Sequence, residues 1–385
     1  MYQIIYIISD FKESSLPNSI SLYYNEMKKK RPLSREDYYF YREYKNKISN
    51  TQVLVKVLDC LRKNYFHYKT PITLPELTSI VSDTSNSYYK DFRINKKTGG
   101  RRLISAPNQR LKEIQNCIRI LITGFYFRGK SITKDAINHV GKEVIYNIDI
   151  KDFYPSIDIT KVLPIFLKRN YTYDVALFIS LLVTKRSKKG IPVLPQGAPT
   201  SPAISNLVLR HLDCRLSAYA SKHNLNYSRY VDDITFSCSK SQPWCFHASI
   251  FKRIISSEGF IVNRKKTRVS FDFQRQEVLG LTVNSRLNVP RKYIKNLRTI
   301  LHNWEKDGYV KANNNFLLHY YKDMINPKSF VPKMEHVILG KLSYLKMVRN
   351  FKAKEGQIDS LWQKLHIRYT KLMWRDHSII SHLVH

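Results

Sequence analysis

The middle of the chain consists of short apolar runs separated by polar turns, a pattern that predicts β-strands. Residues 144–150 (VIYNIDI) form an almost continuous apolar run, which is typical of a buried strand. Residues 228–237 contain two segments rich in residues that favour β-strands, and an Asp-Asp turn separates them. We also expect a strand pair within residues 260–270 and a strand with a glycine kink over residues 277–284.

A strand–turn–strand unit is expected nearer the N-terminus, over residues 89–94 and 101–106. Gly99 and Gly100 supply the positive φ angles that a tight hairpin needs. Elsewhere, apolar residues recur at intervals of three and four, which is the period of an amphipathic helix. This spacing predicts helices over residues 111–127, 160–168, 173–184, 201–222 and 247–257.

The two ends of the chain differ from this central region. Residues 9–70 are rich in Tyr and Lys and predict mainly helix. Residues 71–85 contain Pro71, Pro75 and many Ser and Thr residues, and we expect a loop there. After Pro290 the chain is predicted to be helical, basic and aromatic to its end.

Charge separates this chain from ordinary globular proteins of its size. Among 385 residues there are 65 Lys and Arg and 30 Asp and Glu, a formal net charge of +35. Such an excess repels itself in a compact chain unless a polyanion screens it, and nucleic acid is the commonest such partner. The hydrophobic content of 43% excludes a disordered basic tail, because it is sufficient for a folded core.

Cysteine spacing and hydropathy restrict the location of the protein. The five cysteines form no Cys-x-x-Cys pair, which argues against a zinc site and predicts reduced thiols in the cytoplasm. No run approaches about 18 uninterrupted apolar residues, so we expect no membrane insertion.

Carboxylates occupy the tips of two predicted strands, Asp149 on one and Asp232 with Asp233 on the other. Adjacent carboxylates repel one another unless a cation lies between them. Carboxylate oxygens select hard ions such as Mg²⁺, and three of them suit a two-metal centre for phosphoryl or nucleotidyl transfer. An isolated Asp-Asp pair is nevertheless more often a hairpin turn or a helix cap.

Five sequence motifs favour the metal site. They are Asn147–Ser156 (NIDIKDFYPS), Leu194–Pro202 (LPQGAPTSP), Tyr230–Asp233 (YVDD), Asn263–Thr267 (NRKKT) and Val278–Leu281 (VLGL). Their order and content resemble the palm motifs of reverse transcriptases over roughly residues 88–290, and the resemblance is greatest to the bacterial retron-type enzymes. It implies an α+β right-hand polymerase fold with fingers, a palm built on an antiparallel sheet, and a helical thumb.

The resemblance assigns the chemistry to the carboxylates. It implies that Asp149, Asp232 and Asp233 are the catalytic residues. It also implies that the same three residues, together with Ile150, bind two Mg²⁺ ions.

The nucleotide pocket is implied in the same way. Tyr154 would be a steric gate that excludes a ribose 2′-hydroxyl, although an aromatic residue at a strand end is also a common core residue. Gln196 and Gly197 would line the pocket, where glycine permits a close approach of the backbone. A simple loop before a helix would carry the same residues.

Three cations complete the expected nucleotide site. Lys96 and Arg102 flank the glycine turn of the predicted hairpin and could close on a triphosphate, since Arg offers a bidentate fork and Lys a point charge. Lys266 is placed to donate a proton to the leaving pyrophosphate. Any one of the three could instead be a surface charge, although the match to the family pattern is best for Arg102.

Nucleic-acid contacts are expected in two further regions. Leu279 and Gly280 lie in the motif that resembles the primer grip. In the basic C-terminal region, cations interleave with Tyr293 and Trp304 on one predicted helix, and we expect them to follow the backbone of a duplex. They are Arg291, Lys292, Lys295 and Arg298. A helical bundle with a solvated basic face is the alternative.

The predicted domains are an N-terminal helical extension (1–70), fingers (71–142), a palm with finger insertions (143–284) and a helical basic thumb (285–385). The expected function is RNA-directed DNA synthesis on a structured non-coding RNA template, with dNTPs as substrates and an RNA–DNA product.

The resemblance further implies a role in bacterial antiphage defence with a separately encoded effector protein. Two retron markers depart from the pattern: Asp135 stands in place of Asn before the first palm motif, and Val278-Leu279-Gly280 stands where Val-Thr-Gly is usual. Related antiphage reverse transcriptases outside the retrons therefore stay open. Two further alternatives are an RNA-making polymerase and an RNA-binding scaffold with the palm fold.

Overall fold

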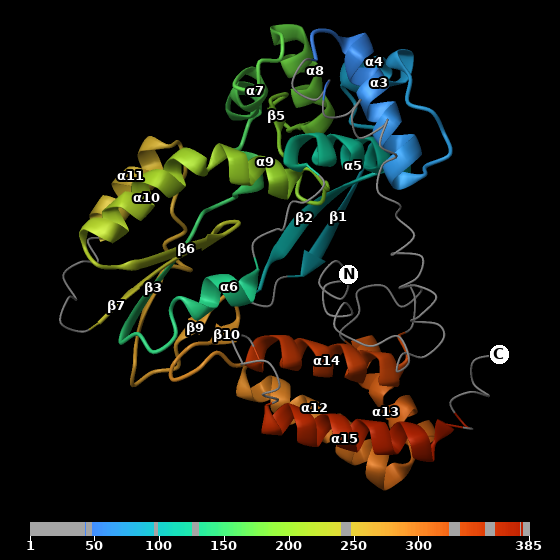
Figure 1. Cartoon of the computed structure of the whole chain (residues 1–385), viewed down its shortest axis with the longest axis vertical. Helices are drawn as coiled ribbons and strands as arrows, with labels where there is room; N and C mark the ends of the chain where they lie inside the picture. The colour runs from blue at the N-terminus through green and yellow to red at the C-terminus, as the bar shows by residue number, and fades with distance from the viewer. Residues whose placement is uncertain are drawn as a thin grey trace.

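The structure is a computed structural model that describes residues 43, 48–95, 99–124, 131–239, 248–322, 332–350, 359–377 and 379. Most of the predicted N-terminal extension lies outside the described residues. The chain folds into a helical upper part, a central sheet with helices on its faces, and a separate lower group of helices (Figure 1).

A four-stranded antiparallel sheet is the centre of the fold, with strands in the order β6-β7-β3-β8. Their bounds are β3 Val144–Asp149, β6 Asn226–Tyr230, β7 Asp233–Cys238 and β8 Arg268–Phe271. The apolar run and the two β-strand segments predicted from the sequence therefore form three neighbouring strands. Their alternating side chains give the sheet two chemically different faces.

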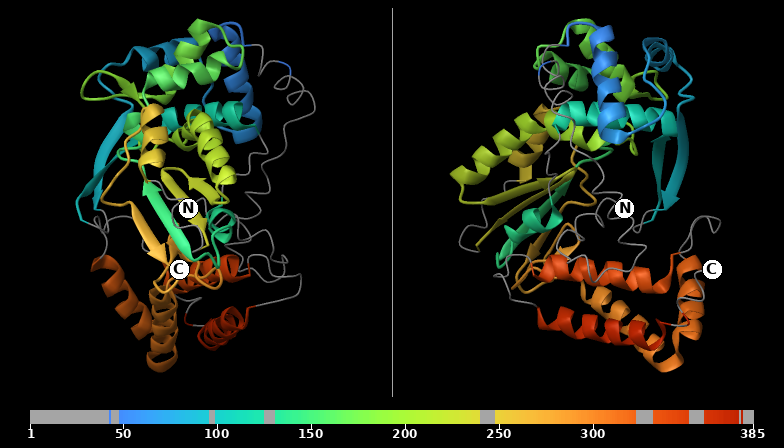
Figure 2. Two further views of the ribbon diagram at one scale, coloured as in Figure 1. Left: turned by 90° about the vertical axis from the view of Figure 1, so that its left-hand side faces the viewer. Right: turned by 45° about the vertical axis from the view of Figure 1, so that its right-hand side comes forward.

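The apolar face of the sheet is covered by helices. Tyr146 of β3 and Phe236 of β7 pack against Phe251 of α11 (Ala248–Ser257), with ring centroids 5.8 and 4.2 Å apart. Alongside lies α10 (Arg210–Lys222), which buries Leu212 and Leu216 in the same cluster. This helical layer lies on one side of the strands only (Figures 1 and 2).

The opposite face carries polar side chains and is covered at one end only. There α6 (Ile132–Ile137) and the hairpin of β9 (Glu277–Val278) and β10 (Leu281–Thr282) enclose Ile145, which is fully buried. At the other end of the same face lies Asp149.

The upper part of the molecule consists of helices and two small hairpins. Their bounds, in chain order, are α3 Thr51–Leu61, the π-helix η3 Arg62–Phe66, α4 Leu74–Ser82, β1 Tyr89–Asn95, β2 Arg101–Pro107, α5 Gln109–Thr123, the 3₁₀ turn η4 Tyr154–Ser156, α7 Ile159–Leu167, α8 Tyr173–Val183, β4 Lys185–Arg186, β5 Pro192–Val193 and α9 Ser201–Val208. The helices among these elements share one hydrophobic cluster with the helix-covered face of the sheet.

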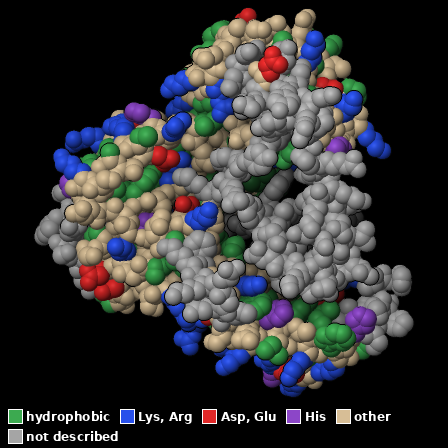
Figure 3. Space-filling view, in the orientation of Figure 1, with side chains coloured by type: hydrophobic (Ala, Val, Ile, Leu, Met, Phe, Trp, Pro, Cys, Tyr) green, Lys and Arg blue, Asp and Glu red, His purple; other side chains and the backbone are tan. Residues whose placement is uncertain are grey.

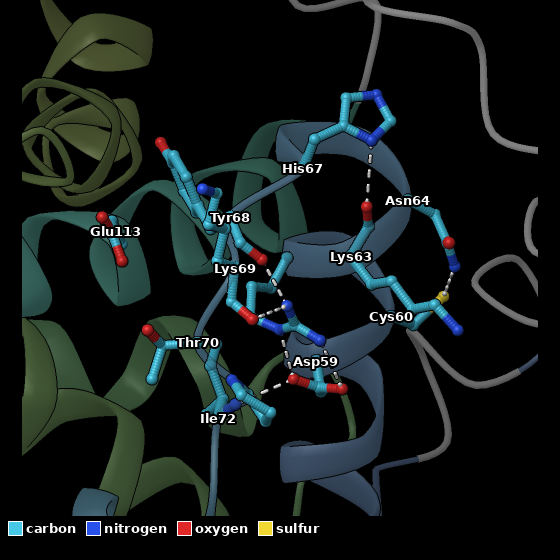
Figure 4. Close-up of polar contacts among 12 residues, drawn as sticks. Asp59, Cys60, Lys63, Asn64, His67, Tyr68, Lys69, Thr70, Ile72 and Glu113 are labelled. Carbon is cyan, nitrogen blue, oxygen red and sulfur yellow. Dashed lines mark hydrogen bonds and ion pairs between the residues drawn. The ribbon is translucent and has the colours of Figure 1, made fainter.

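A partly buried ion pair fixes the start of this region. The guanidinium of Arg62 donates to both carboxylate oxygens of Asp59, at 2.5 and 3.2 Å, and to the carbonyls of Tyr68 and Lys69. Asp59 also accepts a bond of 2.8 Å from the backbone of Ile72 (Figure 4). The contacts join the end of α3 to the segment that leads into α4.

Four helices form the lower group: α12 Arg291–Asp307, α13 Tyr309–Lys322, α14 Met334–Arg349 and α15 Ser360–Arg375. Their core includes Leu297, Trp304 and Leu342, and it continues into the β9–β10 hairpin. The predicted domain boundary at residue 285 stays a prediction, and the hairpin before it packs with the helices after it.

Four details differ from the sequence prediction. The expected loop at 71–85 contains α4, because Pro75 lies in the first turn, where a helix needs no N–H donor. The single helix expected over 201–222 is interrupted at Leu209. Within 260–270 only β8 is a strand, and Val262 forms one isolated bridge with Ile150.

The fourth difference is the segment 277–284, which is a hairpin and not a kinked strand. Leu279 and Gly280 both have positive φ, at 53° and 80°, and they close a two-residue loop between β9 and β10. Positive φ at both loop positions is the geometry that matches the twist of a tight hairpin.

Candidate functional site

Two carboxylates face each other at the end of the sheet. Asp149, the last residue of β3, is the register partner of Asp233, the first residue of β7. Residues directly opposite on antiparallel strands point to the same face. Asp232 lies in the turn beside them, where its carbonyl accepts a 3.3 Å bond from the backbone N–H of Ile150. The three predicted catalytic residues and Ile150 are therefore neighbours.

The carboxylates influence one another electrostatically. Loss of water, followed by the charges of Asp232 and Asp149, raises the pKa of Asp233 to about 6. Burial, and then the charge of Asp149, raises the pKa of Asp232 as well. Lys266 opposes both shifts. Concentrated negative charge of this kind is relieved by a cation.

The turn that carries Asp232 has an unusual backbone. Val231 has a φ of +57°, a region that β-branched residues rarely adopt. Hairpin loops with positive φ at the first loop position normally place Gly there. A non-glycine residue in this region costs about 1–3 kcal/mol, and such positions concentrate at functional sites.

Both oxygens of Asp149 already have partners from the protein. Lys266 Nζ lies 2.8 Å from Oδ1, and Asn263 Nδ2 lies 3.0 Å from Oδ2. Over the described residues, no three His, Cys, Asp or Glu side chains are grouped so as to hold a metal ion. Lys266, predicted from the sequence as part of the nucleotide site, thus contacts one of the predicted metal ligands directly.

Tyr154 lies next to this cluster, in η4 immediately after β3. Burial raises the pKa of its hydroxyl, the nearby charge of Asp232 adds to the rise, and Arg102 opposes it. Its neighbour Phe153 is the buried aromatic of the pair, with only 4% of its surface exposed. Asp232 and the hairpin cation Arg102 are therefore near enough for their charges to act on the Tyr154 hydroxyl, whereas Lys96 lies outside the described residues.

Gln196 and Gly197 lie in the loop before α9, against strand β2. The carbonyl of Gln196 accepts a 2.8 Å bond from the backbone of Ser105. Gly197 has a φ of +131°, and a Cβ added there would lie 3.0 Å from the carbonyl oxygen of Ser105. Gly197 therefore permits a close approach between this loop and the backbone of β2. The contact joins the loop to the hairpin that carries Arg102.

The predicted nucleic-acid residues divide into exposed and buried sets. Leu279 is partly buried against the lower helices and Gly280 is exposed. Four cations of α12 are all exposed: Arg291, Lys292, Lys295 and Arg298. Lys and Arg side chains are also scattered over much of the visible surface (Figure 3).

The two aromatic residues expected among these cations do not share their exposure. Trp304 is fully buried and donates from Nε1 to Asp376 at 2.7 Å, and the hydroxyl of Tyr293 donates to the carbonyl of Lys341 at 3.0 Å. The prediction that both interleave with the cations on one nucleic-acid face is wrong, because the helix turns them toward α14 and α15.

Two residues at the sheet were not assigned a role from the sequence. Asn263 holds Asp149 by its side chain, and its backbone N–H also donates to the Asp149 carbonyl at 2.7 Å. His139 is buried and bridges the hydroxyls of Ser228 and Ser237, at 2.8 and 2.7 Å. Asn263 opens the Asn263–Thr267 motif, and His139 lies four residues after the retron marker position Asp135, so the position of each residue in or near a motif was the available signal.

Comparison with known proteins agrees with the geometry. Residues 94–283, about half of the chain, match the family model described as "Reverse transcriptase (RNA-dependent DNA polymerase)". The chain is 35% identical over 265 residues to the Retron Mx65 reverse transcriptase of Myxococcus xanthus, a match covering 63% of this chain and 62% of that one. It is 33% identical over 258 residues to the Retron Mx162 enzyme of the same organism, covering 57% and 53%.

A third relative is the Retron Ec86 reverse transcriptase of Escherichia coli, 29% identical over 239 residues, covering 59% of this chain and 73% of that one. The matches thus span 62% and 53% of the lengths of the two Myxococcus relatives. No helix in the described part of the chain is long and apolar enough to cross a membrane.

Proposed function

The chain belongs to the bacterial retron-type reverse transcriptases, and from this premise we propose that it is an RNA-directed DNA polymerase that copies a structured non-coding RNA into DNA. The observation that carries the proposal is the pairing of Asp149 with Asp233 across two strands, with Asp232 in the adjoining turn, at one end of the polar sheet face. The proposed domains are the fingers (71–142), palm (143–284) and thumb (285–385), preceded by an N-terminal extension (1–70).

The donor set fits magnesium. All the candidate ligands are oxygens, which hard divalent ions prefer. The pKa values of Asp232 and Asp233 are raised first by burial and then by the neighbouring carboxylate charges, and a cation would offset both effects. We propose that Asp149, Asp232 and Asp233, with Ile150, hold two Mg²⁺ ions. When bound, such ions activate the attacking primer hydroxyl and neutralise charge on the departing pyrophosphate.

The neighbouring residues are proposed to bind the nucleotide. Arg102, together with Lys96, binds the triphosphate, since a guanidinium fork suits phosphate oxygens. Tyr154 excludes the ribose 2′-hydroxyl. Gln196 and Gly197 complete the pocket wall. Lys266 Nζ lies directly beside Asp149, one of the proposed metal ligands. In this position its ammonium group is proposed to donate the proton that the leaving pyrophosphate needs.

Contacts to nucleic acid are assigned to two elements. The β9–β10 loop, with Leu279 and Gly280, is proposed to position the primer end. The exposed cations of α12 are proposed to contact the phosphate backbone of the template–product duplex, where affinity arises from release of counterions.

The biological setting is inferred from the relatives, which are named as retron enzymes. We propose that the template is a dedicated non-coding RNA, that the enzyme acts in antiphage defence, and that a separately encoded effector responds to it. We also propose a cytoplasmic location, because the five cysteines of the sequence form no Cys-x-x-Cys pair and no spacing typical of a disulfide framework.

Sequencing of the nucleic acid that co-purifies with the protein tests this function. The wild-type preparation is expected to contain an RNA and DNA complementary to part of it. The variant Asp232→Ala/Asp233→Ala should retain the RNA and lack the DNA. RNA without complementary DNA in the wild type would instead favour the palm-fold RNA-binding scaffold.

A further inference from the structure

A buried arginine lies directly behind the Val231–Asp232 turn. Arg229 belongs to β6, and its side chain is completely inaccessible to solvent. It projects from the apolar face of the sheet toward α9 and α10, away from the carboxylates. A charged side chain in this position needs compensating partners.

Asp213 of α10 supplies the main compensation. Arg229 Nε and Nη2 each lie 2.6 Å from one of its carboxylate oxygens, a bidentate pair. The hydroxyl of Tyr227 donates to the same carboxylate at 2.6 Å, and Asn206 of α9 accepts from Arg229 Nη1 at 3.2 Å. Burial by itself lowers the pKa of Arg229, but the Asp213 carboxylate more than offsets this, so the net shift is upward and the guanidinium stays charged.

The remaining contact reaches the turn itself. Arg229 Nη1 donates to the carbonyl oxygen of Val231 at 2.9 Å. That carbonyl belongs to the peptide linking Val231 to Asp232, so its orientation determines where the Asp232 backbone lies. Val231 is also the residue with the rare positive φ.

Stability alone does not explain this arrangement. Apolar residues of similar volume often replace a buried ion pair without loss of stability. The guanidinium of Arg229, however, does what an apolar side chain cannot. Asp213 fixes the plane of the guanidinium, so that one of its N–H groups is directed at the carbonyl of the Val231–Asp232 peptide. We infer that Arg229 and Asp213 are positioning residues that hold the Val231–Asp232 peptide in the conformation the catalytic turn requires.

This inference rests on the proposed polymerase function, and the test separates the two. Arg229→Lys keeps the charge but cannot bind Asp213 bidentately and reach Val231 together. In dNTP incorporation on a primed RNA, we expect kcat per folded molecule to fall about 10- to 100-fold, with little change in the KM for dNTP. Arg215→Lys is the matched control, because Arg215 lies on the same helix as Asp213 but pairs with Glu258 at 2.6 Å.

A second substitution tests the turn directly. Gly adopts positive φ without strain. Adding Val231→Gly to the Arg229→Lys variant should therefore raise its kcat by about tenfold or more. A role in stability alone would change the melting temperature and the folded fraction, and Val231→Gly would not restore kcat. Asp213→Asn, which keeps the side-chain volume, should behave as Arg229→Lys does.

The outcomes are distinguishable. No incorporation by the wild type would contradict the proposed function. Wild-type incorporation with unchanged kcat in the folded Arg229→Lys and Asp213→Asn variants would overturn the positioning role. Failure of both variants to fold would also overturn it, since the pair would then be a requirement of the fold.

Discussion

The ammonium nitrogen of Lys266 lies 2.8 Å from Oδ1 of Asp149, and Asn263 holds the other carboxylate oxygen. A proposed metal ligand is therefore already engaged by two donors of the protein. In the proposed metal site, an ion bound to Asp149 would repel the Lys266 ammonium and so favour its movement away from that oxygen. Displacement would free Lys266 to approach the pyrophosphate at the moment when a proton is needed.

Substitution of Lys266 should consequently have two separable effects. In Lys266→Ala, single-nucleotide incorporation should fall by about 10²-fold, the usual contribution of a positioned proton donor. The Mg²⁺ concentration for half-maximal rate should decrease, because a competing cation is gone. Rapid-quench kinetics over a magnesium titration measure both effects. Lys265→Ala, at the exposed neighbouring residue, is the control, and identical behaviour of the two variants would exclude this role.

Tyr154 is expected to control selection of the sugar. Its ring lies beside Asp232 and Phe153, so its removal opens space next to the catalytic turn. Tyr154→Ala should reduce the preference for dNTP over NTP by roughly 10- to 100-fold, whereas Tyr154→Phe should retain it. The ratio of kcat/KM for dCTP and CTP on one primed RNA measures the change. An unchanged ratio in Tyr154→Ala would mean that the ring packs as a core residue and does not select the sugar.

The exposed cations of α12 should determine how strongly salt weakens binding. Replacement of Arg291, Lys292, Lys295 and Arg298 by Gln should lower affinity for an RNA–DNA duplex and flatten its dependence on salt. The slope of log K against log salt should fall by ~0.7–0.9 for each phosphate that the variant no longer neutralises. Fluorescence anisotropy between 50 and 300 mM salt, a range chosen around physiological screening at about 150 mM, measures this.

The control for that experiment replaces Arg210 and Lys222 on α10 by Gln. These exposed residues lie on the helix layer behind the apolar sheet face. The control removes two charges and the α12 variant four, so the loss of affinity is compared per charge removed; equal losses per charge would show that overall charge, and not the α12 surface, governs binding.

His139 should make stability depend on pH. Burial, with a smaller effect of Lys142, lowers its pKa to about 4, below an unfolded value of 6.5. Between these values the unfolded state takes up the proton, so folding becomes less stable as pH falls from about 6.5 to 4. The loss at pH 5 is about 2 kcal/mol.

Urea unfolding at pH 7.5 and pH 5 measures the free energy of unfolding for this purpose. His139→Gln retains a polar partner for Ser228 and Ser237 but does not titrate. The wild type should lose about 2 kcal/mol more than this variant between the two pH values. Equal losses would mean that the buried imidazole does not carry the pH dependence.

Local pattern in the sequence predicted much of the site. The apolar run ending near Asp149 and the segments around Asp232 and Asp233 form adjacent strands, as alternation predicts. The glycine hairpin at Gly99 and Gly100 is likewise confirmed, with φ angles of 85° and 79°. These features depend on residues near in sequence, where strand period and turn geometry suffice.

Features that depend on tertiary contacts were missed. The apolar spacing of residues 201–222 continues through Leu209, yet Arg229 bonds to Asn206 on one side of the break and to Asp213 on the other. Trp304 was expected beside the cations of its helix. The spacing of apolar residues along one helix does not show which other helices pack against each of its faces, and Trp304 is in fact buried. Arg229 is a charged residue in a strand segment that was predicted to be β-rich. A charged residue in such a position indicates a buried partner of opposite charge, and this indication in the sequence was not used.

Primer extension on an RNA template tests the central claim most directly. With dNTPs and Mg²⁺, the wild type should extend the primer, and removal of Mg²⁺ by EDTA should abolish extension. Asp149→Asn and Asp232→Asn, verified as folded by thermal denaturation, should retain less than about a thousandth of the wild-type rate, because loss of a ligand charge disables the metal site. Extension by these folded variants at the wild-type rate, or extension without a divalent ion, would contradict the account.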